Sequence, residues 1–372
     1  MTFTTRITTA DGQAVTVTSQ SQPITDWTAR YLGTWWNASP TIPGPATGPA
    51  IAADIDPQQQ AALTAHVTSR QPQEVTYAAA RTLVVRDEDG TVRAAQPDEG
   101  LAYEWDPAAR RLVITGTDET AVATATARLA REMVRSQLLA DGWHILHASA
   151  VTRPSDGATL LTLGKKGAGK TTTALLLART SYQLLANDRV FVRHEGDRVR
   201  ILPWPSAAAL GFGLLDALDL YEPVRARLAS GQQMHPTQNQ KVTDALLAGD
   251  RTPLWKTNGT EMKPQFFPDQ LRDWLSLPLA TEGHAAGILF PEIVRDTEPK
   301  LGGTVSRALG ADDFFTAGTE DRYPDVFGLL PATRSSDDLA DRLAQLPHQA
   351  VTMSHDTTAN TTVLEKAAAQ ML

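Results

Sequence analysis

The chain has 372 residues, of which 42% are hydrophobic and 20% are charged, and its formal net charge is -8. This composition excludes a disordered chain, and the length suits two domains or one domain with a large accessory module. The acidic balance disfavours nucleic acid and anionic membranes as partners, and the absence of cysteine excludes disulfides, thiolate nucleophiles and cysteine-based metal sites.

The first residues, Met1–Arg6, carry no apolar run of the kind that marks a secretory signal. No continuous apolar stretch reaches the about 18 residues that a membrane-spanning helix needs. By elimination, we expect a soluble, cytoplasmic protein.

Residues 1–117 alternate short strand-like runs with turn signals. Two pairs of runs predict hairpins: Thr82–Arg86 with Thr91–Arg93, and Tyr103–Trp105 with Leu112–Thr115. Pro57–Val67 predicts a helix, with Asp56 as its N-cap and proline at its first position. No chemical motif is present here, so we interpret residues 1–117 as an N-terminal α+β accessory domain.

Residues 118–372 are interpreted as a second domain, which begins with a helix over 118–140. After it, the pattern predicts a helix at Thr171–Ala178 and a final helix at Asp337–Leu346. It also predicts strands at Ile145–Val151, Leu160–Leu163, Gln183–Ala186, Val190–Arg193, Ala285–Phe290 and Ala350–Met353. The alternation of strands and helices indicates an α/β domain.

A phosphate-binding motif lies between one of these strands and the helix that follows it. Gly164 through Thr171 matches the pattern GxxxxGK[ST] of the Walker A loop in full. Glycines let backbone N–H groups point at phosphate oxygens, and the start of the following helix adds partial positive charge. The residues expected to contact the nucleotide, ATP by default, are Gly164, Lys165, Lys166, Gly167, Ala168, Gly169, Lys170, Thr171 and Thr172.

Two further polar positions flank this loop in the sequence. Asn187 and Asp188 follow an apolar strand, where a carboxylate can hold Mg²⁺ or orient an attacking hydroxyl. His147 lies in the strand before that of the loop, where a histidine is either a satisfied core residue or an acid, base or donor near phosphate.

The order of Leu146-His147, the loop Gly164–Thr171 and Leu185-Ala-Asn-Asp-Arg-Val190 resembles the kinase domain of the HPr kinase/phosphorylase family. In particular, it resembles the HPr-kinase-like proteins found beside biosynthetic genes. The resemblance covers His144–Arg193 well. It implies a phosphoenolpyruvate-carboxykinase-like P-loop fold with a mixed sheet and the use of ATP and Mg²⁺. It also raises the option of a homo-oligomer, because the parent family assembles into oligomers.

The resemblance also implies individual roles. His147 would lie near the phosphates, Lys170 would be the loop lysine, and Thr171 would ligate the metal. The family has an Asp pair where this chain has Asn187 and Asp188, and an amide cannot accept a proton. Either Asp188 therefore serves as both metal ligand and base, or His147 supplies the base. The family's Gly after the histidine is replaced by Ala148, and its downstream glutamate segment is missing, which puts HPr as substrate and the phosphorylase activity in doubt.

Phosphoryl transfer needs cations around the transferred group. Arg189, Lys241 and Lys263 are candidates on the substrate side, together with the amide of Asn187, although a single lysine is more often a solvated surface charge. Trp204 is a candidate for stacking on a base, against the commoner packing role. The charged segment Thr319–Asp325 is either a lid or a loop.

Together these patterns predict an ATP- and Mg²⁺-dependent kinase with an alcohol group as acceptor, either on a small metabolite or on a peptide serine. The catalytic candidates are Asp188, His147 and Lys170, and the metal candidates are Thr171 and Asp188. The alternative is a nucleotide-binding regulatory module with weak or no transferase activity, which the missing first aspartate favours.

Overall fold

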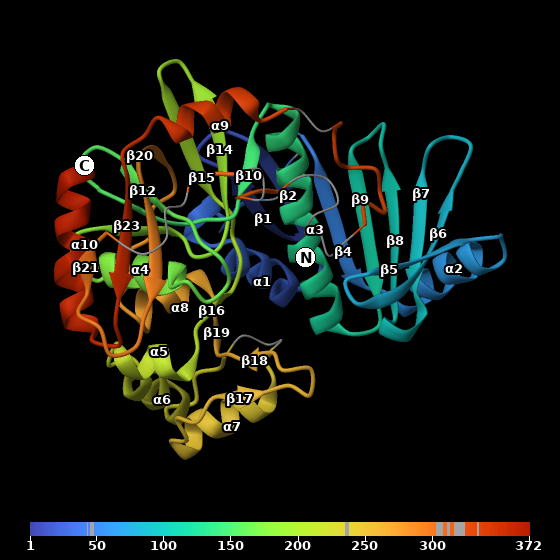
Figure 1. Cartoon of the computed structure of the whole chain (residues 1–372). Helices are drawn as coiled ribbons and strands as arrows, with labels where there is room; N and C mark the ends of the chain where they lie inside the picture. Colours follow the sequence, from blue (N-terminus) through green and yellow to red (C-terminus); the bar gives the residue numbers. More distant parts are fainter. Residues whose placement is uncertain are drawn as a thin grey trace. The chain divides into compact units, whose positions relative to one another are not determined.

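The computed structural model describes residues 1–42, 44, 48–234, 238–302, 308–310, 313–315, 324–332 and 335–372. The chain forms two compact units (Figure 1). Unit 1 comprises Met1–Trp143 and Thr316–Arg334, and unit 2 comprises His144–Phe315 and Ser335–Leu372. Each unit combines helices with a sheet of parallel and antiparallel pairs, which confirms the α/β class expected from the sequence.

Unit 1 is built on a nine-stranded sheet with the order β3-β1-β2-β4-β9-β8-β7-β6-β5. Its strands are β1 (Phe3–Thr8), β2 (Ala14–Ser19), β3 (Ser39–Pro40), β4 (Ala50–Ile55), β5 (Gln73–Tyr77), β6 (Ala80–Arg86), β7 (Val92–Gln96), β8 (Leu101–Asp106) and β9 (Arg111–Gly116). Its helices are α1 (Gln22–Leu32), α2 (Pro57–Thr68) and α3 (Glu119–Ala140), with short 3-10 turns at Thr34–Trp36 and Pro97–Glu99. Both expected hairpins, β6–β7 and β8–β9, are present, as is the helix capped by Asp56.

The boundary between the units differs from the one at residue 118 that the sequence suggested. Helix α3 packs on β2, β4 and β9, so it completes unit 1 instead of opening unit 2. Its buried side combines four alanines with larger apolar residues such as Leu129 and Met133. Such a stripe indicates a buried helix face but does not say which sheet it covers.

Helix α2 covers the other face of this sheet. On this face, Val67 of α2 packs with Leu83 and Ala95. Ala94, which precedes Ala95 in β7, points to the opposite face, and so does its pairing partner Tyr103.

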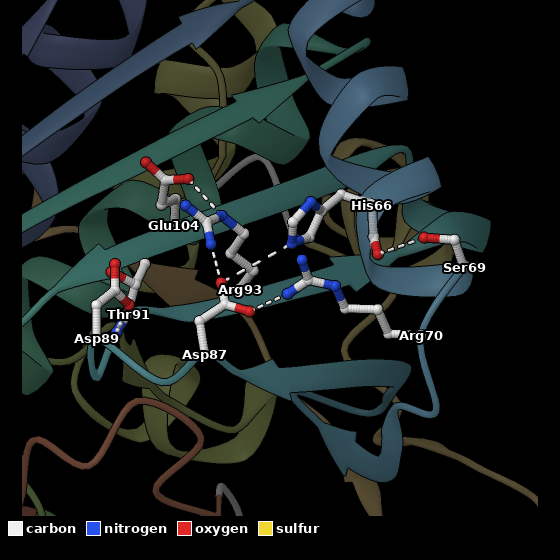
Figure 2. A network of polar contacts seen from close by, with 8 residues as sticks. All are labelled: His66, Ser69, Arg70, Asp87, Asp89, Thr91, Arg93 and Glu104. Carbon is white, nitrogen blue, oxygen red and sulfur yellow. Dashed lines mark hydrogen bonds and ion pairs between the residues drawn. The ribbon is translucent and has the colours of Figure 1, made fainter.

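An ionic network fixes the end of α2 (Figure 2). The carboxylate of Asp87, in the β6–β7 turn, binds the guanidinium groups of Arg70 and Arg93, and Arg93 Nε also donates to Glu104 Oε2 at 2.7 Å. His66 Nε2 lies 3.8 Å from the Asp87 carboxylate.

Unit 2 contains a ten-stranded sheet with the order β13-β11-β12-β20-β15-β14-β10-β22, in which β23 pairs with β20 and β21. Its strands are β10 (His144–Leu146), β11 (Ser149–Thr152), β12 (Ala158–Thr162), β13 (Gln183–Ala186), β14 (Val190–Glu195), β15 (Arg198–Pro203), β20 (Gly283–Ile293), β21 (Lys300–Leu301), β22 (Phe314–Phe315) and β23 (His348–Met353). The helices on this sheet are α4 (Lys170–Ala178), α9 (Asp337–Ala344) and α10 (Thr357–Met371).

The helices cover the two faces of this sheet. Helices α4 and α10 contact each other and lie on the face of Leu160 and Gly287, while Leu339 and Leu343 of α9 pack on the face of Leu161. The helix expected to be final, near Asp337, is followed by one more, α10.

A group of short elements follows β15. It contains β16 (Ala208–Ala209), α5 (Phe212–Ala217), α6 (Tyr221–Ala229), α7 (Gln240–Ala248), β17 (Leu254–Trp255), β18 (Glu261–Met262), β19 (Gln265–Phe266) and α8 (Pro268–Asp273). Arg179, at the end of α4, donates to Leu218 O, and Thr357 Oγ1, at the start of α10, donates to Ala217 O at 3.1 Å, so α4 and α10 anchor this group.

None of the helices in the described part of the chain is long and apolar enough to span a bilayer.

Candidate active site at the edge of the unit 2 sheet

The phosphate-loop motif forms a tight loop between β12 and α4. Gly167 and Gly169 have φ angles of +85° and +105°, which residues with a side chain rarely adopt. A Cβ at Gly164 would lie 2.9 Å from Ala168 Cβ, and one at Gly169 would lie 2.5 Å from Met353 Cε. The backbone conformation therefore favours glycine at position 167, close packing favours it at position 164, and both favour it at position 169.

Lys170 begins α4 and reaches back across this loop. Its Nζ donates a 2.7 Å hydrogen bond to Gly164 O, and the residue is only 9% exposed. Lys165 and Lys166 are exposed, and Thr171 and Thr172 are half-buried. An ammonium held over the loop at the start of a helix gives the concentration of positive charge that a phosphate group needs.

Strand direction brings the predicted site residues to the same edge of the sheet as this loop. Strand β11 runs antiparallel to both β12 and β13, so β12 and β13 point the same way. The carboxyl ends of β12 and β13 therefore meet at the edge where β11 begins. The phosphate loop follows β12, Asn187 and Asp188 follow β13, and His147 lies just before β11.

Asp188 is the centre of the polar contacts at this edge. Its Oδ1 lies 3.0 Å from His147 Nε2, and its Oδ2 lies 3.4 Å from Arg189 Nε. Burial alone would raise the pKa of Asp188. The hydrogen bond from His147 and the positive charges of His147, Arg189 and Lys170 have the larger effect, so the pKa of Asp188 lies below its usual value. Asp188 is therefore an anion at neutral pH, and its side chain remains 46% exposed.

Asn187 is fixed through its backbone and leaves a side-chain oxygen unused. Ser149 Oγ donates to the carbonyl of Asn187 at 2.6 Å, which ties the start of β11 to the end of β13. Asn187 is 9% exposed, and its Oδ1 has no hydrogen-bond partner among the described residues. A buried acceptor without a partner costs free energy, and a bound ligand or ion that used it would remove that cost.

Phe315 is a site residue that the sequence did not indicate. Its ring centroid lies 5.4 Å from that of His147 and 4.4 Å from the guanidinium carbon of Arg189. The backbone N–H of His147 also donates to Asp313 O at 2.8 Å. Phe315 belongs to the two-residue strand β22, which is too short to give a periodic pattern.

Other candidates from the sequence have different environments. Trp204 is 4% exposed and stacks on Phe191 at 5.2 Å, which makes it a core residue. Lys241 is exposed in the first turn of α7, and Lys263 pairs with Glu261 at 3.2 Å. Neither lysine makes a recorded contact with the loop within the described residues. Most of the Thr319–Asp325 segment lies outside the described residues.

Within the ranges that the structure describes, no group of three or more His, Asp or Glu side chains could hold a metal by itself. A divalent cation at this edge would have to use a hydroxyl, a single carboxylate and the phosphates of a nucleotide. That is the usual way in which proteins bind Mg²⁺.

Comparison with known proteins does not assign this chain to a family. No family model matches the chain, and no curated protein matches it. Among solved structures, it is similar to the Hpr(Ser) kinase/phosphatase from Coxiella burnetii, with 12% identity and a TM-score of 0.25, over 61% of this chain and 97% of that chain. This is a distant resemblance in structure, so the chemistry of the site rests on its own residues.

Proposed function

We propose that the chain is an ATP- and Mg²⁺-dependent kinase that transfers the γ-phosphoryl group to a hydroxyl of a small metabolite or of a peptide serine. The observation that carries the proposal is the pairing of His147 and Asp188 at the sheet edge from which the phosphate loop emerges. A nucleotide-binding loop alone fits many reactions, whereas an ionised carboxylate beside it fits transfer to an oriented acceptor.

The loop would neutralise the negative charge of the phosphates. Backbone N–H groups of residues 165–171 and the start of α4 would bind phosphate oxygens, and Lys170 would exchange its bond to Gly164 O for the β- and γ-phosphates. These fixed donors need no reorganisation during transfer, which is the main source of catalysis in phosphoryl transfer.

The donor set at the edge fits Mg²⁺. The Thr171 hydroxyl and the Asp188 carboxylate are ligands of the type that this ion prefers, and the unpartnered amide oxygen of Asn187 is a third oxygen for it or for its water. A cation held by these residues would supply positive charge to offset that of the phosphates.

The lowered pKa of Asp188 bears on the choice of base. A carboxylate with a low pKa is a weak proton acceptor, so Asp188 is better suited to orienting the acceptor hydroxyl and holding the cation. Because His147 Nε2 donates to the Asp188 carboxylate, the histidine would then receive the proton on its other ring nitrogen, Nδ1. The loose transition state of phosphoryl transfer demands little from a base, so orientation carries most of the effect.

The test is ADP production from MgATP with and without a library of hydroxyl acceptors, together with mass spectrometry of the products. We expect one class of acceptor to stimulate turnover and to gain one phosphate. Lys170→Ala should abolish nucleotide binding, whereas Lys166→Ala removes the same charge from an exposed position, keeps the backbone N–H, and should weaken binding far less. Tight ATP binding without a phosphorylated product for any acceptor would refute the kinase.

A regulatory nucleotide-binding module is the second candidate, and Asn187 favours it because an amide cannot serve as a base. In that case ATP binding would still require Lys170, but the addition of acceptors would leave ADP production unchanged. The same assay therefore separates the two functions.

A further inference from the structure

A cavity lies in unit 1, and none of its lining residues belongs to the phosphate loop. Its volume is about 450 Å³, within the range of small-molecule sites. Its walls include Trp105, Met133, Leu329 and Pro331, which are apolar, together with Arg110 and Gln137. The lining combines apolar and polar surface in similar amounts, which suits an organic ligand that carries a polar group.

The cationic group of this cavity occupies a backbone position that does not favour arginine. Asp106 ends β8 and pairs with Arg111 at the start of β9, so Arg110 is the last residue of a four-residue hairpin loop. Its φ angle is +51°, in the left-handed region where glycine or asparagine is preferred. A side chain at this position costs conformational energy, so its presence suggests a use for the guanidinium group.

That guanidinium group is available to a ligand. Within the described residues, Arg110 forms no ion pair and no side-chain hydrogen bond, although the acidic residue Asp106 stands just before the loop. The Asp106 carboxylate instead accepts from the N–H groups of Ala108 and Ala109 at 2.9 and 3.0 Å, and so shapes the turn. In a protein of net charge -8, an unpaired guanidinium in the wall of a cavity attracts an anion locally.

The opposite wall is held in place before any ligand binds. Phe327 packs edge-on against Tyr103, with ring centroids 5.8 Å apart. The Asp325 carboxylate accepts from the N–H groups of Leu329 and Leu330 at 2.8 and 2.9 Å. Arg86 donates to Val326 O at 2.9 Å. A wall fixed by these contacts loses little entropy on binding, which favours a specific ligand.

We infer that unit 1 binds a small amphiphilic anion, with an apolar or aromatic body between Trp105 and Leu329 and one carboxylate, sulfonate or phosphate group on Arg110. This site is independent of the proposed kinase function, since it shares no residue with the phosphate loop.

The probe for the test is 8-anilino-1-naphthalenesulfonate, which has an aromatic body and one sulfonate and fluoresces in apolar sites. N-phenyl-1-naphthylamine, which lacks the sulfonate, is the neutral control. We expect the full-length protein to bind the sulfonate at one saturable site that excess MgATP does not displace. Arg110→Gly should weaken its binding by about tenfold or more, because a charge-assisted contact is lost, and should leave the neutral dye within twofold.

Two further variants keep the test decisive. Arg111→Ala removes the same charge from the adjacent residue outside the cavity and should bind the sulfonate like the unmodified protein. Ser136→Trp fills the cavity from α3 and should abolish binding of both dyes, with circular dichroism confirming the fold. Arg110→Gly itself should unfold at the same or a higher temperature, because glycine relieves the left-handed conformation.

Unchanged sulfonate affinity in Arg110→Gly, equal losses in Arg110→Gly and Arg111→Ala, or displacement of the dye by MgATP would each overturn the inference. None of these outcomes depends on whether the chain is a kinase.

Discussion

His147 Nε2 lies 3.0 Å from Asp188 Oδ1. Each of these residues lies in a connection that leads from one half of the unit 2 sheet to the other. His147 joins β10 to β11, and Asp188 joins β13 to β14. Strands β11 and β13 lie on one side of β12, while β10 and β14 lie on the far side of β20 and β15. His147 and Asp188 are therefore close together because these two connections meet beside the phosphate loop.

Asp188→Asn should separate binding from transfer. The amide keeps the shape but loses the negative charge, so we expect acceptor-dependent turnover to fall by about 10²–10⁴-fold, the usual range for a positioned acid–base group. Metal-free ADP binding depends on the loop and should change little. The measurements are steady-state kinetics and calorimetric titration; a loss of ADP affinity as large as the loss of turnover would contradict this assignment.

Gly169→Ala and Gly167→Ala form a matched pair. Both place a side chain at a positive φ angle, which costs about 1 kcal/mol or more. At Gly167 the new Cβ meets nothing within 4 Å, whereas at Gly169 it meets Met353 and Ile293. Gly169→Ala should therefore lose about 1–3 kcal/mol more in urea unfolding, the typical cost of overpacking. Equal losses of unfolding free energy in the two variants would show that the contact with Met353 does not destabilise Gly169→Ala.

Asn187→Leu should reduce the effect of Mg²⁺ on ATP binding without lowering the stability of the fold. It removes the buried oxygen without a partner, so the free energy of unfolding should hold steady or rise by about 1 kcal/mol. The same change removes an oxygen from the magnesium side of the site, so the gain in ATP affinity on adding Mg²⁺ should shrink. Calorimetric titration with and without Mg²⁺ measures this gain, and an unchanged gain would exclude Asn187 from the metal site.

His66 should make unit 1 sensitive to mild acid. Burial and the guanidinium groups of Arg70 and Arg93 hold the pKa of His66 below its usual value of 6.5. The nearby Asp87 carboxylate does little to reverse this, because both arginines already bind it.

The unfolded chain therefore takes up a proton near pH 6.5 that the folded chain takes up only at lower pH, and stability falls as the pH drops from 6.5 towards the folded value. His66→Gln should lose less stability than the unmodified protein between pH 7.5 and 5.5 in urea unfolding. Identical losses would show that His66 does not contribute to the pH dependence.

Much of the site could be predicted from the sequence because its signals are local. The phosphate loop is defined by glycines at fixed spacing, and Asp188 follows an apolar run, so both could be placed at strand ends. That His147 and Asp188 touch depends on strand direction and order, which no local pattern encodes. For the same reason the sequence could not show that α3 packs on the sheet of unit 1.

Helix α10 was missed because its buried positions include Asn360 and two alanines, which give no apolar stripe. The short elements between α5 and α8 span two to nine residues each, fewer than a periodic pattern needs. Phe315, on the two-residue strand β22, was overlooked for the same reason.

The wall of the unit 1 cavity comes from Gly328–Pro331, far along the chain from the sheet on which it packs. During synthesis, residues 1–143 leave the ribosome long before this segment exists, so Tyr103 lacks its contact with Phe327 until most of unit 2 has been translated. A fragment ending at Trp143 would lack Phe327 and its neighbours. Expression of unit 1 alone therefore calls for a circular permutation or a linker that restores residues 324–332, and truncation at the apparent boundary yields an incomplete core.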